Sequence, residues 1–555
     1  MAKLAQTIIE QRGDQMFPSL EQSQMDRLLR FGTRRSFVSG DAIVATGEAG
    51  HGLTLVLSGK VEVTQLDGGE RLHIVTHGPG SFMGELAQLS GRPSLVDAHA
   101  LTPVEAVIIP PERLRALLIA EADLGERIMR ALILRRVGLI ESGAGGPVIV
   151  GEAGDRSVLN LEGFLRRNGH PHQHLDSASD AEAKELVERF NVSPEEMPIV
   201  LCPGGQLLRN PSEGALARCI GLVGPIDQDK LFDVVVVGAG PAGLATAVYA
   251  GSEGLSVLVL DCRSFGGQAG ASARIENYLG FPTGISGMAL MARAYSQAQK
   301  FGVELAIPDE AVKLECSASP VRLDLGSGEV VQARTAVIAT GARYRRLGVD
   351  GLEKFEGSAV HYWASPLEAA LAAGEDVVLA GGGNSAGQAV VFLAAHARSV
   401  TVIVRRPLEA TMSSYLIDRI AGLANVTLVV GWEIVALEGQ GERLSAATCR
   451  NAATGAEVRH VATHLFSFIG ADPNTDWLAA AGLKVDSGNF LCTGTAAGEG
   501  RHLLETSRCH VFAVGDVRSG SVKRVAAAVG DGAQVVAAIH ALFATEETEA
   551  DSAVL

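Results

Sequence analysis

The sequence predicts a multidomain protein in which a small β-barrel or jelly roll precedes several α/β units. The chain has 555 residues, which is more than one hydrophobic core normally serves, so we expect three or four domains. Up to about residue 140, short strand-like segments alternate with Gly-rich turns, which is typical of small barrels. From residue 231 onward, two Gly-rich turns each join a strand-like segment to a helix-like one. This pattern is typical of parallel α/β units that bind nucleotides.

Composition narrows the class of protein further. Apolar residues make up 47% of the chain and glycines number 65, which suits α/β units with many tight turns. The net charge of −16 and the pI of about 5.4 disfavour nucleic acid or an anionic membrane as a partner. The first residues contain no long apolar segment, so we expect a cytoplasmic protein. The uncharged run from Val234 to Gly251 approaches the length of a membrane span, but glycines and Pro241 interrupt it.

The seven cysteines form no Cys-x-x-Cys pair. The sequence therefore predicts neither a disulfide framework nor a zinc ribbon, and no metal site is expected.

Residues 1–142 contain a short helical segment, the strand-like segments and one long amphipathic helix from Pro111 to about Ser142. The segments SGKVEVT and GPGSFMGELAQLSGRPSLVDAHA, in this order, resemble the cyclic-nucleotide-binding domain family. The resemblance implies a barrel fold.

In that family a Gly-Glu step binds the ribose 2′-hydroxyl, and Glu85 after Gly84 matches it. An arginine nine or ten residues later holds the cyclic phosphate. Here Ser94 and Leu95 occupy those positions, and Arg92 comes earlier. We therefore expect a structural or dimerising barrel that binds cyclic nucleotides weakly or not at all.

Residues 143–228 follow the order β-α-β-α-β-β-α and resemble a thioredoxin-fold domain. Met197-Pro198 precedes the third strand, where that fold places a cis-proline beside its active site. The turn that should carry the redox pair, Glu152 to Ser157, contains no cysteine. We expect a docking or spacer domain in which Cys202 is a buried structural cysteine.

The segment FDVVVVGAGPAGLATAVYAGSEGLSVLVLDC contains a strand, the turn Gly238-x-Gly240-x-x-Gly243, a helix and a second strand that ends at Asp261. The three glycines allow a tight turn, a close approach of a pyrophosphate and the packing of helix on strand. The helix N-terminus attracts phosphate, and Asp261 is placed to accept a hydrogen bond from a ribose hydroxyl.

A second copy, EDVVLAGGGNSAGQAVVFLAAHARSVTVIVRR, contains Gly381-x-Gly383-x-x-Ala386. The position equivalent to Asp261 is a valine followed by Arg405 and Arg406. Loss of the acid and gain of two cations favour a 2′-phosphate, hence NADP over NAD. The alternative is that these arginines only solvate the end of a strand.

A third segment, CHVFAVGDVRSGSVKRVAAAVGDGAQVVAAIHAL, contains a strand ending at Gly515-Asp516 and a long helix that we expect to begin near Val522. With GGQ, ENYLGF, VIATGA and FIGADPNT in order, residues 231–545 resemble the low-molecular-weight thioredoxin reductase family. The resemblance implies two Rossmann-like domains: an FAD domain at 229–345 and 460–545, and an NAD(P)H domain at 346–459 between its halves. Residues 546–555 remain as a tail, and members of this family are typically cytoplasmic homodimers.

The same resemblance implies the residues that contact the cofactors. For FAD these are Gly238, Gly240, Pro241, Ala242, Gly243, Asp261, Gly267, Gln268, Asn277, Thr340, Gly341, Gly515, Asp516, Arg524 and Ala526. For NADP they are Gly381, Gly383, Asn384, Ser385, Ala386, Arg405 and Arg406.

Thioredoxin reductases carry a Cys-Ala-Thr-Cys segment upstream of the second Gly-rich turn. Here the segment reads Trp363-Ala-Ser-Pro366, so no dithiol can relay electrons through it. Trp363 is an aromatic residue that either serves as a catalytic residue, by stacking over the flavin or shaping an acceptor pocket, or packs in the core.

We therefore expect an FAD-dependent NAD(P)H oxidoreductase whose flavin passes electrons directly to an acceptor, with a redox protein among the candidates, without an internal disulfide. One alternative is a thioredoxin-disulfide reductase. The other is a sensor of NADPH supply that docks a partner through its N-terminal domains.

Overall fold

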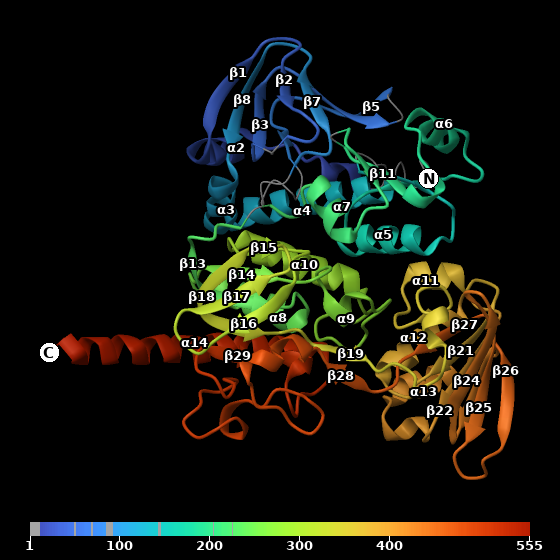
Figure 1. Ribbon diagram of the computed structural model, residues 1–555. Helices are drawn as coiled ribbons and strands as arrows, with labels where there is room; N and C mark the ends of the chain where they lie inside the picture. Colours follow the sequence, from blue (N-terminus) through green and yellow to red (C-terminus); the bar gives the residue numbers. More distant parts are fainter. Residues whose placement is uncertain are drawn as a thin grey trace. The chain divides into compact units, whose positions relative to one another are not determined.

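The computed structural model describes residues 12–48, 51–67, 70–84, 93–142, 146–203, 205–224 and 226–554 (Figure 1). The chain divides into two compact units. The first comprises Met1–Asp229, Gly251–Ser264 and Tyr295–Glu310, and the second comprises Lys230–Ala250, Phe265–Ala294 and Ala311–Leu555. The finer division into domains that the sequence suggests stays a prediction.

The N-terminal part of the first unit is a β-sandwich. Its two antiparallel sheets have the strand orders β1-β8-β3-β6 and β2-β7-β4-β5. The strands are β1 (Thr33–Phe37), β2 (Ala42–Val44), β3 (Leu53–Ser58), β4 (Val61–Asp67), β5 (Glu70–His77), β6 (Phe82–Met83), β7 (Asp97–Ala100) and β8 (Val104–Ile109). Because side chains alternate along β3, Leu53 and Leu55 pack in one core with the helices while Val56 packs in the core between the sheets.

The sandwich is flanked by helices that include α2 (Gln22–Leu28), α3 (Pro111–Ala120) and α4 (Ala122–Ser142). The prediction of one long helix from Pro111 is wrong, because the backbone leaves helical geometry at Glu121. Glu121 pairs there with Arg27 and Arg30. A Cβ at Gly125 would lie 2.8 Å from the carbonyl oxygen of Leu118, so the glycine lets α4 turn back closely against α3.

Residues 146–224 contain a four-stranded sheet of order β10-β9-β11-β12 and three helices. The elements are β9 (Val148–Gly151), α5 (Arg156–Arg167), β10 (Gln173–Asp176), α6 (Ala181–Arg189), β11 (Ile199–Leu201), β12 (Leu207–Arg209) and α7 (Glu213–Cys219). This is the order that the sequence predicts, β9 and β10 are parallel, and the Met197–Pro198 peptide bond is cis as predicted. Phe164 and Leu165 of α5 pack with Leu216 of α7 in a shared core.

The first unit also contains a parallel strand pair from later in the chain, β14 (Val257–Leu260) with β15 (Glu304–Ala306). Asp261 follows β14 directly.

The second unit contains two α/β regions. In the first region β13 (Leu231–Val237) pairs in parallel with β18 (Val330–Ile338), which also pairs with β29 (Val511–Ala513) and β17 (Val321–Leu325). β16 (Ala311–Glu315) completes the path beside β17. The uncharged run from Val234 to Gly251 forms most of β13, a turn and most of α8 (Pro241–Ser252), which is the strand, turn and helix that the sequence predicts.

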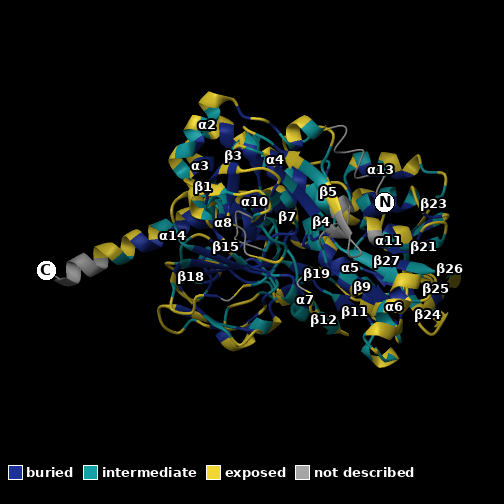
Figure 2. Ribbon diagram, turned by 90° about the horizontal axis from the view of Figure 1, so that it is seen from above, coloured by how far each residue is buried: buried dark blue, intermediate teal, exposed yellow. Residues whose placement is uncertain are grey.

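The other region has a five-stranded parallel sheet of order β20-β27-β21-β22-β23. Its strands are β20 (Val360–His361), β21 (Asp376–Ala380), β22 (Ser399–Val404), β23 (Val426–Val430) and β27 (His464–Ser467), with α11 (Pro366–Leu371), α12 (Asn384–Ala394) and α13 (Ser414–Ala421). A three-stranded antiparallel sheet adjoins it in sequence: β24 (Trp432–Gln440), β25 (Arg443–Asn451) and β26 (Glu457–Val461). The strand pair β19 (Ala342–Tyr344) and β28 (Ala471–Pro473) connects the two regions. Strand β21 is buried except at its first residue, Asp376, and four of the six residues of β22 are buried; Figure 2 colours the described residues by burial.

The last helix, α14 (Val525–Val554), begins three residues after the predicted start at Val522. Its segment Val525–Thr548 has a mean hydropathy of 1.5 and is long enough to cross a bilayer, with 33% of its most apolar window buried. The core helix of a soluble protein passes the same test, so length and composition do not assign this helix to a membrane.

Candidate functional site: two dinucleotide cradles

The first Gly-rich turn has the geometry of a phosphate cradle. Gly238 has a φ of +113°, and a Cβ there would lie 2.2 Å from the carbonyl oxygen of Ala339. A Cβ at Gly243 would lie 1.8 Å from the oxygen of Gly238. At Gly240, in contrast, the nearest atom to a Cβ is 3.9 Å away. The outer glycines therefore let strand and helix close up, and the middle one leaves open space at the N-terminus of α8, which fits a pyrophosphate.

Segments far apart in the sequence converge on this turn. A Cβ at Gly267, in the GGQ segment, would lie 3.1 Å from the Cα of Gly240. A Cβ at Gly515 would lie 2.8 Å from the Cβ of Ala242 in α8. The structure thus brings together three of the motifs on which the FAD prediction rests, together with the Ala339–Thr340 segment against Gly238.

Asp516 lies beside this convergence. It is half-buried, and burial raises the pKa of its carboxyl group above the usual value. The Lys523 ammonium group donates to the Asp516 backbone oxygen over 2.5 Å. The Gly515 N–H donates to Asp531 over 3.0 Å. These two hydrogen bonds hold the turn through its backbone.

Asp261 belongs to the first compact unit. Its Oδ1 accepts the backbone N–H groups of Arg263 and Ser264 over 3.1 and 3.2 Å. These bonds fold the three residues after β14 into a tight turn around the carboxylate.

Among the remaining predicted FAD contacts, two are hydrogen-bonded to Asn474 and three are exposed to solvent. Thr340 and Gly341 are tied to Asn474: the Thr340 Oγ1 donates to the Asn474 oxygen over 2.9 Å, and the Asn474 N–H donates to the Gly341 oxygen over 3.1 Å. The exposed contacts are Asn277, Arg524 and Ala526. Pro241 forms the first residue of α8.

The second Gly-rich turn repeats the cradle. Gly381 has a φ of +140°, and a Cβ there would lie 2.7 Å from the oxygen of Phe468. Nothing lies within 4 Å of a Cβ at Gly383, and Ala386 is fully buried. The space above Gly383 therefore fits the pyrophosphate of a second dinucleotide at the N-terminus of α12.

Polar side chains at this turn form hydrogen bonds with neighbouring elements. The Asn384 Oδ1 accepts the Ser413 N–H over 2.7 Å, which joins the start of α12 to the start of α13. Ser385 is exposed at the first turn of α12 and hydrogen-bonds the Tyr344 hydroxyl. Arg405 and Arg406 follow β22 and are exposed. Among the described residues no hydrogen bond or ion pair involves either guanidinium, so both are available to a ligand phosphate.

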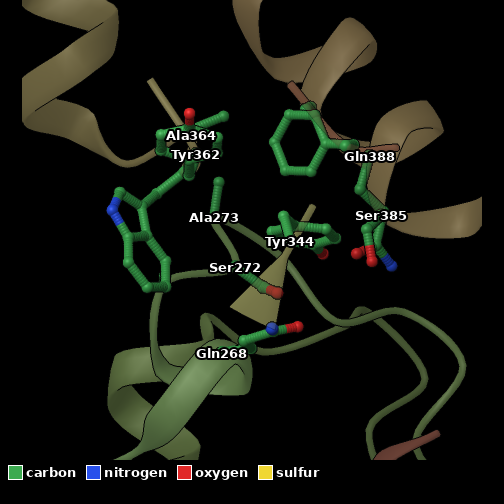
Figure 3. Close-up of a pocket in the computed structure, with 12 residues that line it drawn as sticks. Gln268, Ser272, Ala273, Tyr344, Tyr362, Ala364, Ser385 and Gln388 are labelled. Atoms are coloured by element: carbon green, nitrogen blue, oxygen red, sulfur yellow. The ribbon is translucent and has the colours of Figure 1, made fainter. Parts of the chain in front are cut away.

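Trp363 lines a recess together with Gln268 (Figure 3). The recess has a volume of about 30 Å³ and is lined by Gln268, Ala271, Ser272, Ala273, Tyr344, Tyr362, Trp363, Ala364, Ser385, Gln388, Ala389 and Phe468. The structure thus brings the WASP segment to the GGQ segment, from which it is separated by almost a hundred residues. This volume is far below that of a small-molecule pocket. The catalytic role of Trp363 stays a prediction.

His361, two residues before Trp363 in the sequence, forms a buried pair with His464 that the sequence did not predict. His361 Nε2 lies 2.9 Å from His464 Nδ1, and His361 is 6% exposed. Burial lowers the pKa of His361 to about 3, with the neighbouring His464 as the smaller cause. No motif marks these residues, because the parallel pairing of β20 with β27 is what brings them together.

In the sandwich, Ser94 is 2% exposed and donates its hydroxyl to the Val96 oxygen over 2.8 Å. The Ser94 hydroxyl is therefore used in a local hydrogen bond with the backbone just before β7. Glu85 and Arg92, the other residues on which the cyclic-nucleotide prediction depends, lie outside the described residues.

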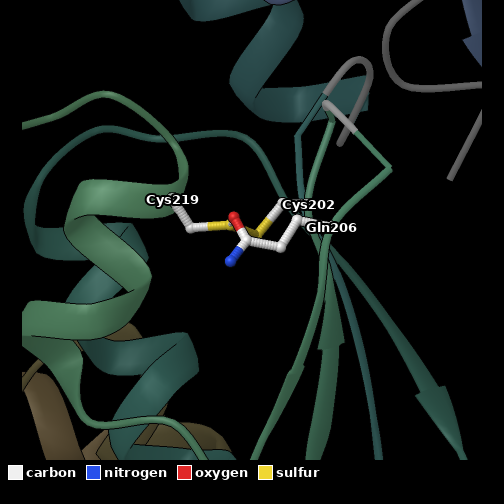
Figure 4. The surroundings of a disulfide bond; sticks show 3 residues. All are labelled: Cys202, Gln206 and Cys219. Atoms are coloured by element: carbon white, nitrogen blue, oxygen red, sulfur yellow. Dashed lines mark hydrogen bonds between the residues drawn. A yellow bond between two sulfur atoms is a disulfide. The ribbon is translucent and has the colours of Figure 1, made fainter.

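The sequence predicts no disulfide framework and an unpaired Cys202, and the second prediction is wrong because the structure contains a disulfide bond. Cys202 and Cys219 form one, with their Cα atoms 6.3 Å apart (Figure 4). Cys202 is 3% exposed, as predicted, but it is not alone. The β11–β12 hairpin followed by α7 returns the chain to the end of β11, and a spacing of 17 residues in the sequence does not reveal this return.

Comparison with known proteins places this site in a family. Residues 232–532, more than half of the chain, match the model of the pyridine nucleotide-disulphide oxidoreductase family, and residues 34–121 match that of the cyclic nucleotide-binding domain. The chain therefore belongs to the pyridine nucleotide-disulphide oxidoreductases and carries an N-terminal cyclic nucleotide-binding domain.

The more specific relatives are thioredoxin reductases. The chain is 34% identical over 306 residues to the thioredoxin reductase of Mycolicibacterium smegmatis, covering 55% of this chain and 94% of that protein. It is 32% identical over 310 residues to the bifunctional thioredoxin reductase/thioredoxin of Mycobacterium leprae, covering 56% and 65%. The crystal structure of T. acidophilum thioredoxin reductase matches 56% of this chain and 99% of its own, with 27% identity and a TM-score of 0.52. This protein is a thioredoxin reductase-like, FAD-dependent NAD(P)H oxidoreductase.

Proposed function

We propose that the protein transfers electrons from NADPH through FAD directly to an acceptor, without a disulfide between flavin and acceptor. FAD and NADPH supply the redox chemistry: the nicotinamide releases a hydride, and the flavin passes its two electrons on. The chain's own residues bind and orient the two cofactors at the two cradles. The observation that carries the proposal is that Trp363, and no thiol, lines the recess beside Gln268.

The free cysteines support this proposal. No cysteine occurs between Cys316 and Cys449. Burial raises the pKa of Cys449 to about 11, and desolvation together with the Asp261 and Glu310 carboxylates raises the pKa of the solvent-exposed Cys262 to about 12. Because the thiolate is the reactive form, neither is an effective relay at neutral pH.

Anaerobic titration with dithionite tests the proposal. Two electrons per chain should bleach the flavin, and the Cys202–Cys219 disulfide is a separate acceptor of two more. In the C202S/C219S variant, uptake should therefore end after one two-electron equivalent per chain. Uptake of four electrons by this variant would mean that another cysteine pair forms, and it would overturn the direct mechanism.

The acceptor is best identified by stopped-flow reoxidation of the NADPH-reduced protein with oxygen, quinones, ferredoxin or flavodoxin, and disulfide proteins. Trp363→Ala should change the reoxidation rate or the flavin fluorescence if the indole lies beside the ring. A variant with unchanged rate and fluorescence would assign Trp363 to packing alone.

A thioredoxin-disulfide reductase is the second candidate function, favoured by the names of the relatives. It predicts rapid NADPH-dependent turnover with thioredoxin, whereas the direct mechanism predicts negligible turnover unless the flavin itself reaches the partner's disulfide. A sensor of NADPH supply would instead show slow turnover with every acceptor.

We further propose that residues 143–228 form a thioredoxin-fold domain without a Cys-x-x-Cys pair. The supporting observations are the element order, the mixed four-stranded sheet and the cis peptide bond at Pro198. From the family resemblance we also propose a cytoplasmic homodimer, which gel filtration of the FAD-loaded protein tests.

A further inference from the structure

The turn after β14 is held from outside by residues 143–228. The Arg263 guanidinium forms a two-pronged ion pair with Glu213: Nε lies 3.1 and 3.0 Å from the two carboxylate oxygens, and Nη2 lies 2.6 Å from Oε1. Such paired, charge-assisted bonds fix orientation as well as distance. Both side chains are half-buried, 36% and 26% exposed, which limits screening by solvent.

The backbone of the same residue is held as well. The Asn168 Nδ2 donates to the Arg263 oxygen over 3.1 Å and to the Phe164 oxygen over 3.0 Å. Asn168 is 7% exposed and is the C-cap of α5. Arg263 is thus held at its side chain and at its carbonyl group, by two different elements.

A helix cap, a disulfide bond and a shared core fix the positions of α5 and α7. Glu213 is the first residue of α7, which Ser212 caps by accepting the Ala215 N–H, and the far end of α7 carries the disulfide to Cys202. The helices α5 and α7 share a buried core that includes Phe164 and Leu216. Side chains fixed by such packing can position a neighbouring group precisely.

What they position is Asp261. The Arg263 N–H donates to the Asp261 Oδ1, so the residue that Glu213 and Asn168 hold is one of the two, with Ser264, whose N–H groups orient this carboxylate. We propose that Asn168 and Glu213 are positioning residues for FAD binding, acting through Arg263 on Asp261. The inference rests on the proposed role of Asp261 as acceptor for the adenosine ribose of FAD, and it gives residues 143–228 a function that needs no thiol.

Flavin affinity of the full-length chain tests the inference. The dissociation constant for FAD is measured by flavin fluorescence in wild type, E213Q and N168A, and that for FMN is measured in parallel. E213Q should weaken FAD binding by about threefold to tenfold, since a partly exposed pair contributes little more than about 1 kcal/mol. FMN binding should not change, because FMN lacks the adenosine ribose that Asp261 is proposed to hold.

R209Q is the matched control, because it removes the Arg209–Glu196 ion pair of the same region, whose side chains are similarly exposed at 39% and 37%. It should leave FAD affinity unchanged. The charge-swapped variant E213K/R263E should recover part of the affinity lost in E213Q, which a purely structural loss of stability would not do.

FAD affinity within 1.5-fold of wild type in both E213Q and N168A would overturn the inference while leaving the proposed function intact. Equal weakening of FAD and FMN would also overturn it, because the effect would then not pass through Asp261. A wild-type chain that binds no FAD would instead defeat the assignment of the cofactor site itself.

Discussion

The two Gly-rich turns of the second unit are built alike in their backbone and differ in the side chains that follow. In each, the first glycine has a positive φ and approaches a carbonyl oxygen, at 2.2 Å for a Cβ on Gly238 and 2.7 Å for one on Gly381. In each, the middle glycine faces open space. After the next strand, however, the first copy continues with Asp261 and the second with Arg405 and Arg406.

This difference separates two tasks. The backbone and the helix N-terminus bind pyrophosphate in both copies, and they do not distinguish one dinucleotide from another. Selection between FAD and NADPH therefore falls to the ribose-binding side chains that follow the second strand. The predictions below test this separation.

The largest effect is expected from filling the cradles. Gly240→Val places a side chain where the pyrophosphate of FAD would lie, and purified protein should be nearly colourless, with FAD binding at least about 100-fold weaker. Gly383→Val should stay yellow but require about 100-fold more NADPH for flavin reduction. The readouts are the flavin absorbance and the KM for NADPH.

Gly348→Val is the control, since nothing lies within 4 Å of a Cβ there and its φ is not positive. It should retain both cofactors. If G240V keeps FAD, or if G383V loses FAD as well as NADPH, the two cradles are not the separate sites that the comparison implies.

The next effect concerns the arginines. Each charge-assisted bond to a 2′-phosphate contributes about 1.5–3 kcal/mol, so the R405A/R406A variant should lose at least about tenfold of the preference for NADPH over NADH. The rate of flavin reduction is measured with both nucleotides, and the value of kcat/KM for NADH should stay the same. A wild type that reacts equally with both nucleotides would contradict the assignment.

Removing the disulfide should affect stability and not the cradles. The C202S/C219S variant frees a loop closed over 17 residues and should lose about 2–4 kcal/mol of unfolding free energy in urea. The FAD content and the rate at which NADPH reduces the flavin should remain within twofold of wild type. C509S, which replaces an exposed free cysteine, controls for the substitution itself. Loss of turnover with the acceptor, while NADPH still reduces the flavin normally, would show that the disulfide takes part in electron flow.

The smallest effect is a pH dependence from His361. Because burial lowers its pKa to about 3 in the folded protein, the unfolded chain binds a proton that the folded chain does not between about pH 6.5 and 3. Stability from this residue is therefore complete above pH 6.5 and falls as the pH drops, by up to about 1.4 kcal/mol per pH unit. Urea midpoints at pH 7 and pH 5 should differ less in His361→Asn than in wild type, and equal differences would contradict this.

The sequence predicts the local parts of this protein well. The Gly-x-Gly spacing after an apolar run predicts the strand, turn and helix of both cradles, because steric demands at a glycine act on neighbouring residues. Alternating apolar residues and Gly-rich turns predict the strands of the N-terminal sandwich, and the order of elements in residues 146–224 follows in the same way. The length of a helix is less secure: the Pro111 segment breaks at Glu121, where contacts with Arg27 and Arg30 are made across the fold.

What only the tertiary structure decides are the contacts between residues far apart in the chain. The disulfide of Cys202 with Cys219, the pairing of His361 with His464, and the hold of Asn168 and Glu213 on Arg263 leave no periodic signal in the sequence. Each depends on how helices and strands return to one another, which packing of the buried core determines. The sequence by itself therefore determines which dinucleotide cradles the chain can form, and the packing of the fold determines which side chains hold their loops in place.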